Sequence, residues 1–180
     1  PTVHEHFKVE SLKFKVNNAE HFGMSMAILA GDLAMAWADE CMGEVNGNAL
    51  ELYHRMKEEV IFGQGLDVLA SAGLPSADRA TINRYKTAWY SVIRPLQIGA
   101  AIGGADEKTL ETFVPYGLAV GEAYQLRDDF LDSVLGEDVF QEQATRCGKE
   151  AVQAVKKLKV SKSVTILLTD FVRFALHRSA

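Results

Sequence analysis

Apolar residues recur every three or four positions over residues 19–40 of this chain. Five large side chains carry the pattern: Phe22, Met26, Leu29, Leu33 and Trp37. Because an α-helix completes a turn in about 3.6 residues, this spacing places the five side chains on one face. Small Ala and Gly residues lie between them and suit close packing. The sequence therefore predicts a long, mostly buried helix.

Similar spacing, interrupted by turn residues, continues along the chain. We expect a second helix over residues 49–71 and a third over residues 79–96. Ser76 or Asp78 is expected to cap the third helix, and Pro95 is expected to kink or stop it. Tight packing or a helix end is expected at residues 99–104, and a loop at 136–141. Further helices are predicted from near Asp106 and over residues 115–134, 151–158 and 165–176. No alternating strand pattern is present, so we predict an all-α fold, a bundle of long, mostly antiparallel helices around a central space.

Size and charge limit the organisation of the chain and its partners. With 180 residues, 48% of them hydrophobic, we expect a single domain over residues 1–180 with a sizeable core. A net charge of −5 argues against nucleic-acid binding. The basic cluster, Lys156, Lys157, Lys159 and Lys162, is expected to be a solvated helix end or loop, because no aromatic residues interleave with it.

Cysteine usage and hydropathy indicate the setting of the protein. Cys41 and Cys147 are far apart and have no His at metal-ligand spacing, which argues against zinc and favours a reducing, cytoplasmic location. No segment approaches ~18 uninterrupted apolar residues, and residues 1–9 lack the apolar core of a signal peptide. We therefore expect a soluble protein without a transmembrane segment.

Three carboxylates, Asp128, Asp129 and Asp132, lie within five positions. On a helix that turns ~100° per residue they project at about 0°, 100° and 40°, with Gln125 inside this arc at about 60°. Crowded carboxylates repel each other, and a divalent cation that prefers oxygen ligands removes that cost. The cluster therefore predicts Mg²⁺ together with a phosphate-bearing ligand.

Small residues precede the acidic cluster on the same stripe. Its members at about four-residue steps are Gly117, Gly121, Gln125, Asp128 and Asp132. One interpretation is a close helix crossing at the glycines followed by a solvated, charged helix end. Gln125 favours the other interpretation, a stripe that faces something polar. Tyr124 on its flank is equally consistent with the core.

Two further groups of residues are candidates for ligand contact. Lys86 and Thr87 adjoin in an otherwise apolar helix, where an ammonium group suits phosphate oxygens, although a surface Lys is more often simply solvated. Residues 63–67 read Gly-Gln-Gly-Leu-Asp, and each glycine inside a helix costs about 0.5–1 kcal/mol relative to Ala. This indicates close approach by backbone or ligand. Gln64 and Asp67 either hydrogen-bond or share one face of a cavity.

These motifs, in this order, resemble the trans-isoprenyl diphosphate synthases of the polyprenyl synthetase family. Residues 30–33 are similar to its Gly-Asp helix, 63–67 to its Gly-Gln-x-x-Asp element, 86–88 to its Lys-Thr motif and 121–132 to its second aspartate-rich motif. The final helix also resembles a family C-terminus. The resemblance implies a helical bundle around a central apolar cavity.

The resemblance also implies roles for individual residues. Mg²⁺ would be held by Asp128, Asp129 and Asp132, with Asp128 as the direct ligand, and the expected catalytic residues are Asp128, Asp129 and Lys86. The expected substrate-binding residues are Lys86, which would hold the allylic diphosphate, together with Gln64, Thr87, Tyr124 and Gln125. The implied reaction is the 1'-4 condensation of isopentenyl diphosphate with an allylic diphosphate to a short-chain trans-prenyl diphosphate, by a homodimer.

Two departures from the family pattern bear on this interpretation. Residues 1–4 resemble the sequence that follows the first aspartate-rich motif, so we expect the N-terminal part of the domain to be missing. No Gly-Lys loop follows Asp132, and Lys149 lies too late to replace it. A non-catalytic subunit of a prenyltransferase is therefore the main alternative. A plain helical interaction protein and a class I terpene cyclase are further alternatives, and the Lys-Thr and Gly-Gln motifs favour chain elongation over cyclisation.

Overall fold

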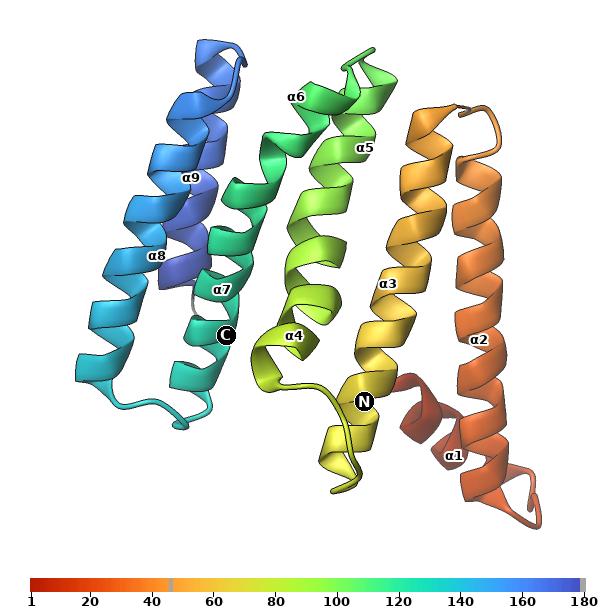
Figure 1. Ribbon diagram of the computed structural model, residues 1–180. Coiled ribbons are helices and arrows are strands. Elements are labelled where there is room, and N and C mark those ends of the chain that lie inside the picture. Colours follow the sequence, from red (N-terminus) through yellow and green to blue (C-terminus); the bar gives the residue numbers. More distant parts are fainter. Residues whose placement is uncertain (46, 179–180) are drawn as a thin grey trace. The chain divides into compact units, whose positions relative to one another are not determined.

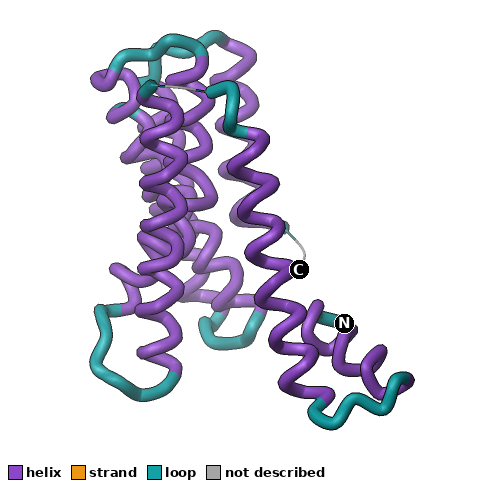
Figure 2. Tube along the Cα trace, turned by 90° about the vertical axis from the view of Figure 1, so that its right-hand side faces the viewer, coloured by secondary structure: helices purple, strands orange, loops and turns teal. Residues whose placement is uncertain are grey.

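Helices form most of the computed structural model, which describes residues 1–45 and 47–178 (Figure 1). These two ranges contain no strand, so the predicted all-α class is confirmed. Short loops join successive helices, as the tube in Figure 2 shows. The chain divides into two compact units, Pro1–Val45 and Asn46–Ala180. Within the described ranges, no helix is both long enough and apolar enough to cross a membrane.

The first unit is a pair of helices, α1 (Val3–Lys13) and α2 (Ala19–Cys41). Asn18 caps α2 by accepting a 3.0 Å hydrogen bond from the backbone N–H of His21. The helices meet at Gly23, where a Cβ atom would overlap the carbonyl oxygen of His4.

The expected helix over residues 19–40 is confirmed, but the prediction that it is mostly buried is wrong. Of the residues of α2, only Gly23 is buried. The 11 residues of α1 reach one end of α2 alone, so most of its apolar face is uncovered within this unit. The exposed side chains include Met24, Ile28, Leu29, Leu33 and Trp37.

The second unit contains the remaining described helices. They are α3 (Asn48–Ser71), α4 (Arg79–Asn83), the π-helix η1 (Arg84–Ile93), α5 (Arg94–Ile102), α6 (Glu107–Glu111), α7 (Phe113–Leu131), α8 (Glu137–Lys157) and α9 (Lys162–His177). The rod of α4, η1 and α5 packs between α3 and α7, and α8 and α9 pack on α7. The long rods run up and down in turn, which confirms the predicted antiparallel bundle (Figure 1).

The expected third helix is longer than predicted. Asp78, rather than Ser76, caps it by accepting a 2.9 Å hydrogen bond from Thr81 N–H, and this bond lowers the pKa of Asp78. Pro95 does not stop the helix, because it lies in the first turn of α5, where its missing N–H is tolerated. The π-helix precedes it, and Arg94 N–H donates to the carbonyl of Trp89, five residues back.

Glycines mark both close crossings of the π-helix. At Gly63 a Cβ would lie 2.7 Å from the backbone nitrogen of Lys86, and at Gly121 it would lie 2.5 Å from the Cβ of Ala88. Gly117 contacts Ile93 in the same way, so a Cβ there would overlap its side chain. The close helix crossing that the first interpretation places at Gly117 and Gly121 is therefore present. Gly65 has open space around it and no such role.

The core lies between α7, α8 and α9. Tyr116, Val120, Cys147 and Ala151 are buried there, and Tyr116 donates a 2.9 Å hydrogen bond to the carbonyl of Leu168. Burial raises the pKa of Tyr116, so its phenol stays protonated and remains a donor.

After the acidic cluster, one predicted element is wrong and the start of another is misplaced. The expected loop at residues 136–141 is largely the first turn of α8, and the expected short helix at 151–158 is the end of that helix. Gly136 is the N-cap, and Glu137 and Asp138 in the first turn favour the positive end of the helix dipole. The basic cluster is exposed at the end of α8 and the start of α9, as predicted.

Candidate active site

The acidic cluster lies at the C-terminal end of α7. Asp128 and Asp129 belong to its last turn, and Asp132 is the C-cap. The carbonyl of Asp129 accepts hydrogen bonds from Val134 N–H (2.8 Å) and Leu135 N–H (3.1 Å), which turn the chain away from the helix. Ser133 has a φ of +58°, a left-handed conformation that ends the helix sharply. The predicted end at residue 134 is therefore three residues too late.

Asp128 is paired with a cation from a distant part of the sequence. Its Oδ1 accepts a hydrogen bond from Nη2 of Arg178, which follows α9 directly. The Arg178 guanidinium also lies 4.0 Å from the centre of the Tyr124 ring, and the Arg178 carbonyl accepts a 2.9 Å hydrogen bond from Nε of Arg127. The Asp128 side chain remains 41% exposed, against 13% for Arg178. Tyr124 is therefore a stacking surface for a cation.

Asp129 faces the rod that contains the π-helix. Its Oδ1 accepts a 2.9 Å hydrogen bond from Nε2 of Gln125 and lies 4.0 Å from Nη2 of Arg79. A cavity of about 440 Å³ lies here between α4, η1 and α7, and its polar lining includes Arg79, Asn83, Arg84, Gln125 and Asp129. Gln125 therefore faces a polar space, as the second interpretation of the stripe predicted.

Lys86 and Thr87 lie on the π-helix. Lys86 Nζ is 2.6 Å from Oδ2 of Asp67 on α3, and both side chains are only partly exposed. Thr87 is half-buried, whereas Gln64 is exposed on α3. Asp67 therefore bonds to Lys86 rather than to Gln64. The structure brings Asp128 and Asp129 together on α7, and it holds Lys86 on the α3 side of the neighbouring π-helix.

Carboxylate oxygens are the ligands that Mg²⁺ prefers, so the donor types of Asp128, Asp129 and Asp132 fit this ion. In the part of the chain that the structure describes, no three acidic, His or Cys side chains are gathered closely enough to hold a metal. Arg178 and Gln125 bond to two of the three carboxylates. The residues therefore suit Mg²⁺ chemically, and an ion at this end of α7 would compete with these partners.

Residues that the sequence did not indicate complete the surroundings of the cluster. Arg178 is 50 residues from Asp128 in the sequence and carries no local motif. Arg79 was predicted only as a helix start. Asp67 was expected either to bond to Gln64 or to share a cavity face with it, and the Lys-Thr motif at Lys86 was the signal that could have indicated its actual partner.

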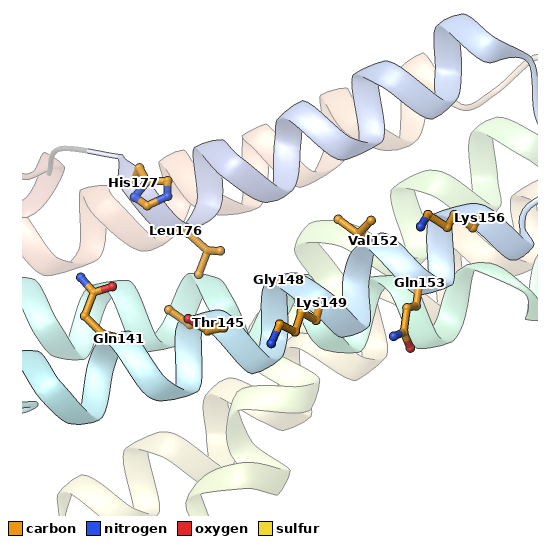
Figure 3. A pocket seen from close by; sticks show the side chains of 10 residues that line it. Gln141, Thr145, Gly148, Lys149, Val152, Gln153, Lys156, Leu176 and His177 are labelled. Carbon is orange, nitrogen blue, oxygen red and sulfur yellow. The ribbon is translucent and has the colours of Figure 1, made fainter.

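A second hollow lies between α8 and α9 (Figure 3). It measures about 480 Å³, and its lining includes Thr145, Lys149, Gln153 and His177. Lys149 lies in the middle of α8 and not in a loop after Asp132. This agrees with leaving Lys149 out of the candidate active site.

The polyprenyl synthetase model matches residues 14–146, which include the π-helix, its Lys-Thr motif and the acidic end of α7. The chain belongs to the polyprenyl synthetase family.

Among curated proteins, the chain is 32% identical over 133 residues to a farnesyl diphosphate synthase of Geobacillus stearothermophilus, a match that covers 66% of this chain and 43% of the relative. It is 28% identical over 148 residues to a short chain isoprenyl diphosphate synthase of Methanocaldococcus jannaschii, covering 77% and 45%. The matches thus span less than half the length of these relatives.

The fold is that of solved prenyl synthases. A geranylgeranyl pyrophosphate synthase from Corynebacterium glutamicum, complexed with isoprenyl diphosphate and magnesium, superposes with a TM-score of 0.86. The match has 23% sequence identity and covers 99% of this chain and 71% of that one. This confirms the predicted isoprenoid synthase type of fold.

Proposed function

We propose that this protein is a short-chain trans-prenyl diphosphate synthase that condenses isopentenyl diphosphate with an allylic diphosphate. The observation that carries the proposal is the packing of the π-helix, with Lys86 and Thr87, against α7, which ends in the acidic cluster. Membership of the polyprenyl synthetase family and its relatives' names support the same reaction. These relatives are named as synthases, which does not favour the non-catalytic subunit.

We assign the cation site to the acidic end of α7. Asp128, Asp129 and Asp132 would hold Mg²⁺, which would supply a Lewis acid for the leaving diphosphate. Lys86 would bind the allylic diphosphate as a compact charge, and Thr87 and Gln125 would line its site. Exposed Gln64 and the ring of Tyr124 complete the proposed substrate contacts, with Tyr124 beside the isopentenyl unit.

The condensation needs charge stabilisation more than proton transfer. The allylic C–O bond breaks, and its electron pair leaves with the diphosphate, whose charge Lys86 would stabilise. The double bond of isopentenyl diphosphate then attacks the allylic carbon. Loss of a proton to the departing diphosphate completes a product longer by one five-carbon unit. Apolar helix faces would keep water from the carbocation.

We further propose that residues 1–180 act within a single domain and that the working form is a cytoplasmic homodimer. Sedimentation velocity of the purified protein tests the oligomeric state, and a single species of monomer mass would contradict it.

The reaction is tested by incubating the purified protein with isotopically labelled isopentenyl diphosphate, Mg²⁺ and either dimethylallyl or geranyl diphosphate. We expect labelled prenyl diphosphates of defined chain length. The Asp128→Asn variant should lose more than about 100-fold in turnover, because a carboxylate ligand of the cation is removed. Asp170→Asn is the matched control, since Asp170 is an exposed carboxylate on α9 paired with Arg173. No product from the unaltered protein would contradict the proposal.

A further inference from the structure

Arg178 makes three separate contacts with the last two turns of α7. Its guanidinium pairs with Asp128, the same group stacks 4.0 Å from the Tyr124 ring centre, and its carbonyl accepts a hydrogen bond from Arg127. A surface Arg that paired casually with an acid would keep most of its side chain in water. Arg178 instead keeps only 13% of its side chain exposed. The residue is therefore seated in a defined place on the acidic end of α7.

The Arg178 guanidinium neutralises a carboxylate that the proposed function assigns to the cation. Asp128 is a carboxylate in a crowded acidic cluster, where an opposite charge removes repulsion from Asp129 and Asp132. A charge-assisted bond from Arg178 does this without a metal ion. A divalent ion at Asp128 would meet the positive charge of the Arg178 guanidinium at close range, so the two cations compete for this carboxylate.

The hydrogen bonding of the Arg178 side chain is also incomplete, which favours its release from Asp128. Its Nε is buried and has no hydrogen-bond partner among residues 1–45 and 47–178, and a buried unsatisfied donor is costly. Release of the side chain would return this donor to water. Asp128 is 41% exposed, so an ion from solvent can approach it while Arg178 is still in place.

We propose that Arg178 is a built-in competitor for the cation site: it neutralises Asp128 in the metal-free protein and must withdraw before Asp128 binds a divalent ion. This inference rests on the proposed function, because that function assigns Asp128 to the cation. The site then exists in two states, one closed by Arg178 and one open to metal. An ion that binds only the open state has its apparent affinity reduced by the fraction of protein that is open.

Mn²⁺ binding, followed by the electron paramagnetic resonance signal of the free ion, tests the inference without any turnover. Arg178→Gln and Arg178→Met remove the charge, and Met retains an apolar stem against Tyr124. Both variants should bind Mn²⁺ about tenfold more tightly than the unaltered protein, as expected if Arg178 closes the site about nine-tenths of the time. Arg173→Gln is the matched control, because it removes the same charge from an exposed position on α9 and should change nothing.

The outcomes separate this inference from the proposed function. Equal or weaker Mn²⁺ binding by both Arg178 variants overturns the inference and leaves the cation site standing. A gain that persists when Asp128→Asn is added also overturns it, because the competition would then lie elsewhere. Absence of Mn²⁺ binding in every variant overturns both the assigned cation site and the inference.

A second measurement uses the unaltered protein and does not depend on the folding of a variant. Trypsin cleaves after Arg178 only when that residue leaves its seat, so Mg²⁺ should accelerate this cleavage, as detected by mass spectrometry of early time points. In Asp128→Asn the cleavage should already be fast and insensitive to Mg²⁺. Cleavage after Arg173 provides the internal control. A rate at Arg178 that Mg²⁺ leaves unchanged or lowers overturns the inference.

Discussion

Gly63 of α3 lies directly against the backbone of Lys86 in the π-helix. A Cβ at residue 63 would lie 2.7 Å from the Lys86 nitrogen, and the Lys86 side chain reaches back to Asp67, one turn further along α3. The glycine therefore lets the two helices approach closely enough for the Lys86–Asp67 pair to form. The close approach of the two helices explains why a glycine, which costs energy inside a helix, lies at this position.

Replacing Gly63 by Ala should destabilise the protein by about 1–3 kcal/mol, because the added methyl group meets backbone atoms that cannot rotate away. Urea denaturation measures the change. Gly65→Ala is the matched control in the same helix. It has no atom within 4 Å of its Cβ position, so it should raise stability by about 0.5–1 kcal/mol. Equal effects at the two glycines would contradict the close crossing.

The second crossing predicts a compensating pair. Gly117→Ala should cost about 1–3 kcal/mol through overlap with Ile93, and Ile93→Ala should cost about 2–5 kcal/mol because Ile93 is fully buried. In the double variant the new methyl group occupies part of the space that Ile93 vacates. The losses in the free energy of unfolding of the two single variants should therefore sum to more than the loss of the double variant, by about 1 kcal/mol or more. Simple additivity would show that the two residues do not share a contact.

A buried ion pair anchors the far end of the π-helix. Arg94 donates to both carboxylate oxygens of Glu59, at 2.8 and 2.6 Å, and to Gln97, while its guanidinium lies over the Trp89 ring. Glu59→Gln should destabilise the fold by about 3 kcal/mol, because it leaves the Arg94 charge buried without a counter-ion. In thermal unfolding, the midpoint temperature should fall more for this variant than for the control Glu122→Gln. Glu122 pairs with Arg146 in solvent, so its change should cost less than about 1 kcal/mol.

The two cysteines should differ in reactivity. Burial, followed by the nearby Glu122 carboxylate, raises the pKa of the Cys147 thiol from 9.0 to about 12, whereas Cys41 is exposed. Ellman's reagent at pH 8 should therefore modify Cys41 in the folded protein and both cysteines in denaturant. Rapid modification of Cys147 in the folded protein would contradict its burial.

The raised pKa of the Cys147 thiol also makes the free energy of unfolding depend on pH. Between about pH 9 and 12 the unfolded chain ionises this thiol and the folded protein does not, so the free energy of unfolding should fall as pH rises through that range. Below pH 9 the thiol is protonated in both states and its contribution is constant. Urea midpoints of the unaltered protein and Cys147→Ala measured across this range test the difference.

Local patterns predicted much of the fold. The helical spacing and turn residues gave α2 and α3 nearly to the residue, and the Gly117–Gly121 stripe predicted a close crossing. The π-helix was not predicted, because residues 84–93 contain no local break, and its wider turns arise where the rod packs against two neighbours. The turn-like composition of residues 136–141 led to a wrong loop prediction, because acidic residues also favour a helix start.

The candidate site was predicted in its residue types more than in its pairings. Gln125 and Asp129 are four residues apart on one helix face, so their contact follows from helical spacing. The partners of Lys86 and Asp128 lie 19 and 50 residues away, and only the packing of α3 and α9 brings them close. Long-range pairs of this kind leave no periodic signal in the sequence.

The most direct test of the assigned site is a crystal structure of the protein with Mn²⁺ and a non-ionisable allylic thiolodiphosphate. We expect an anomalous Mn²⁺ peak about 2.0–2.2 Å from a carboxylate oxygen of Asp128, with Arg178 withdrawn and Lys86 on the diphosphate. A diphosphate bound elsewhere, with Arg178 still paired to Asp128 and no metal at the end of α7, would contradict it.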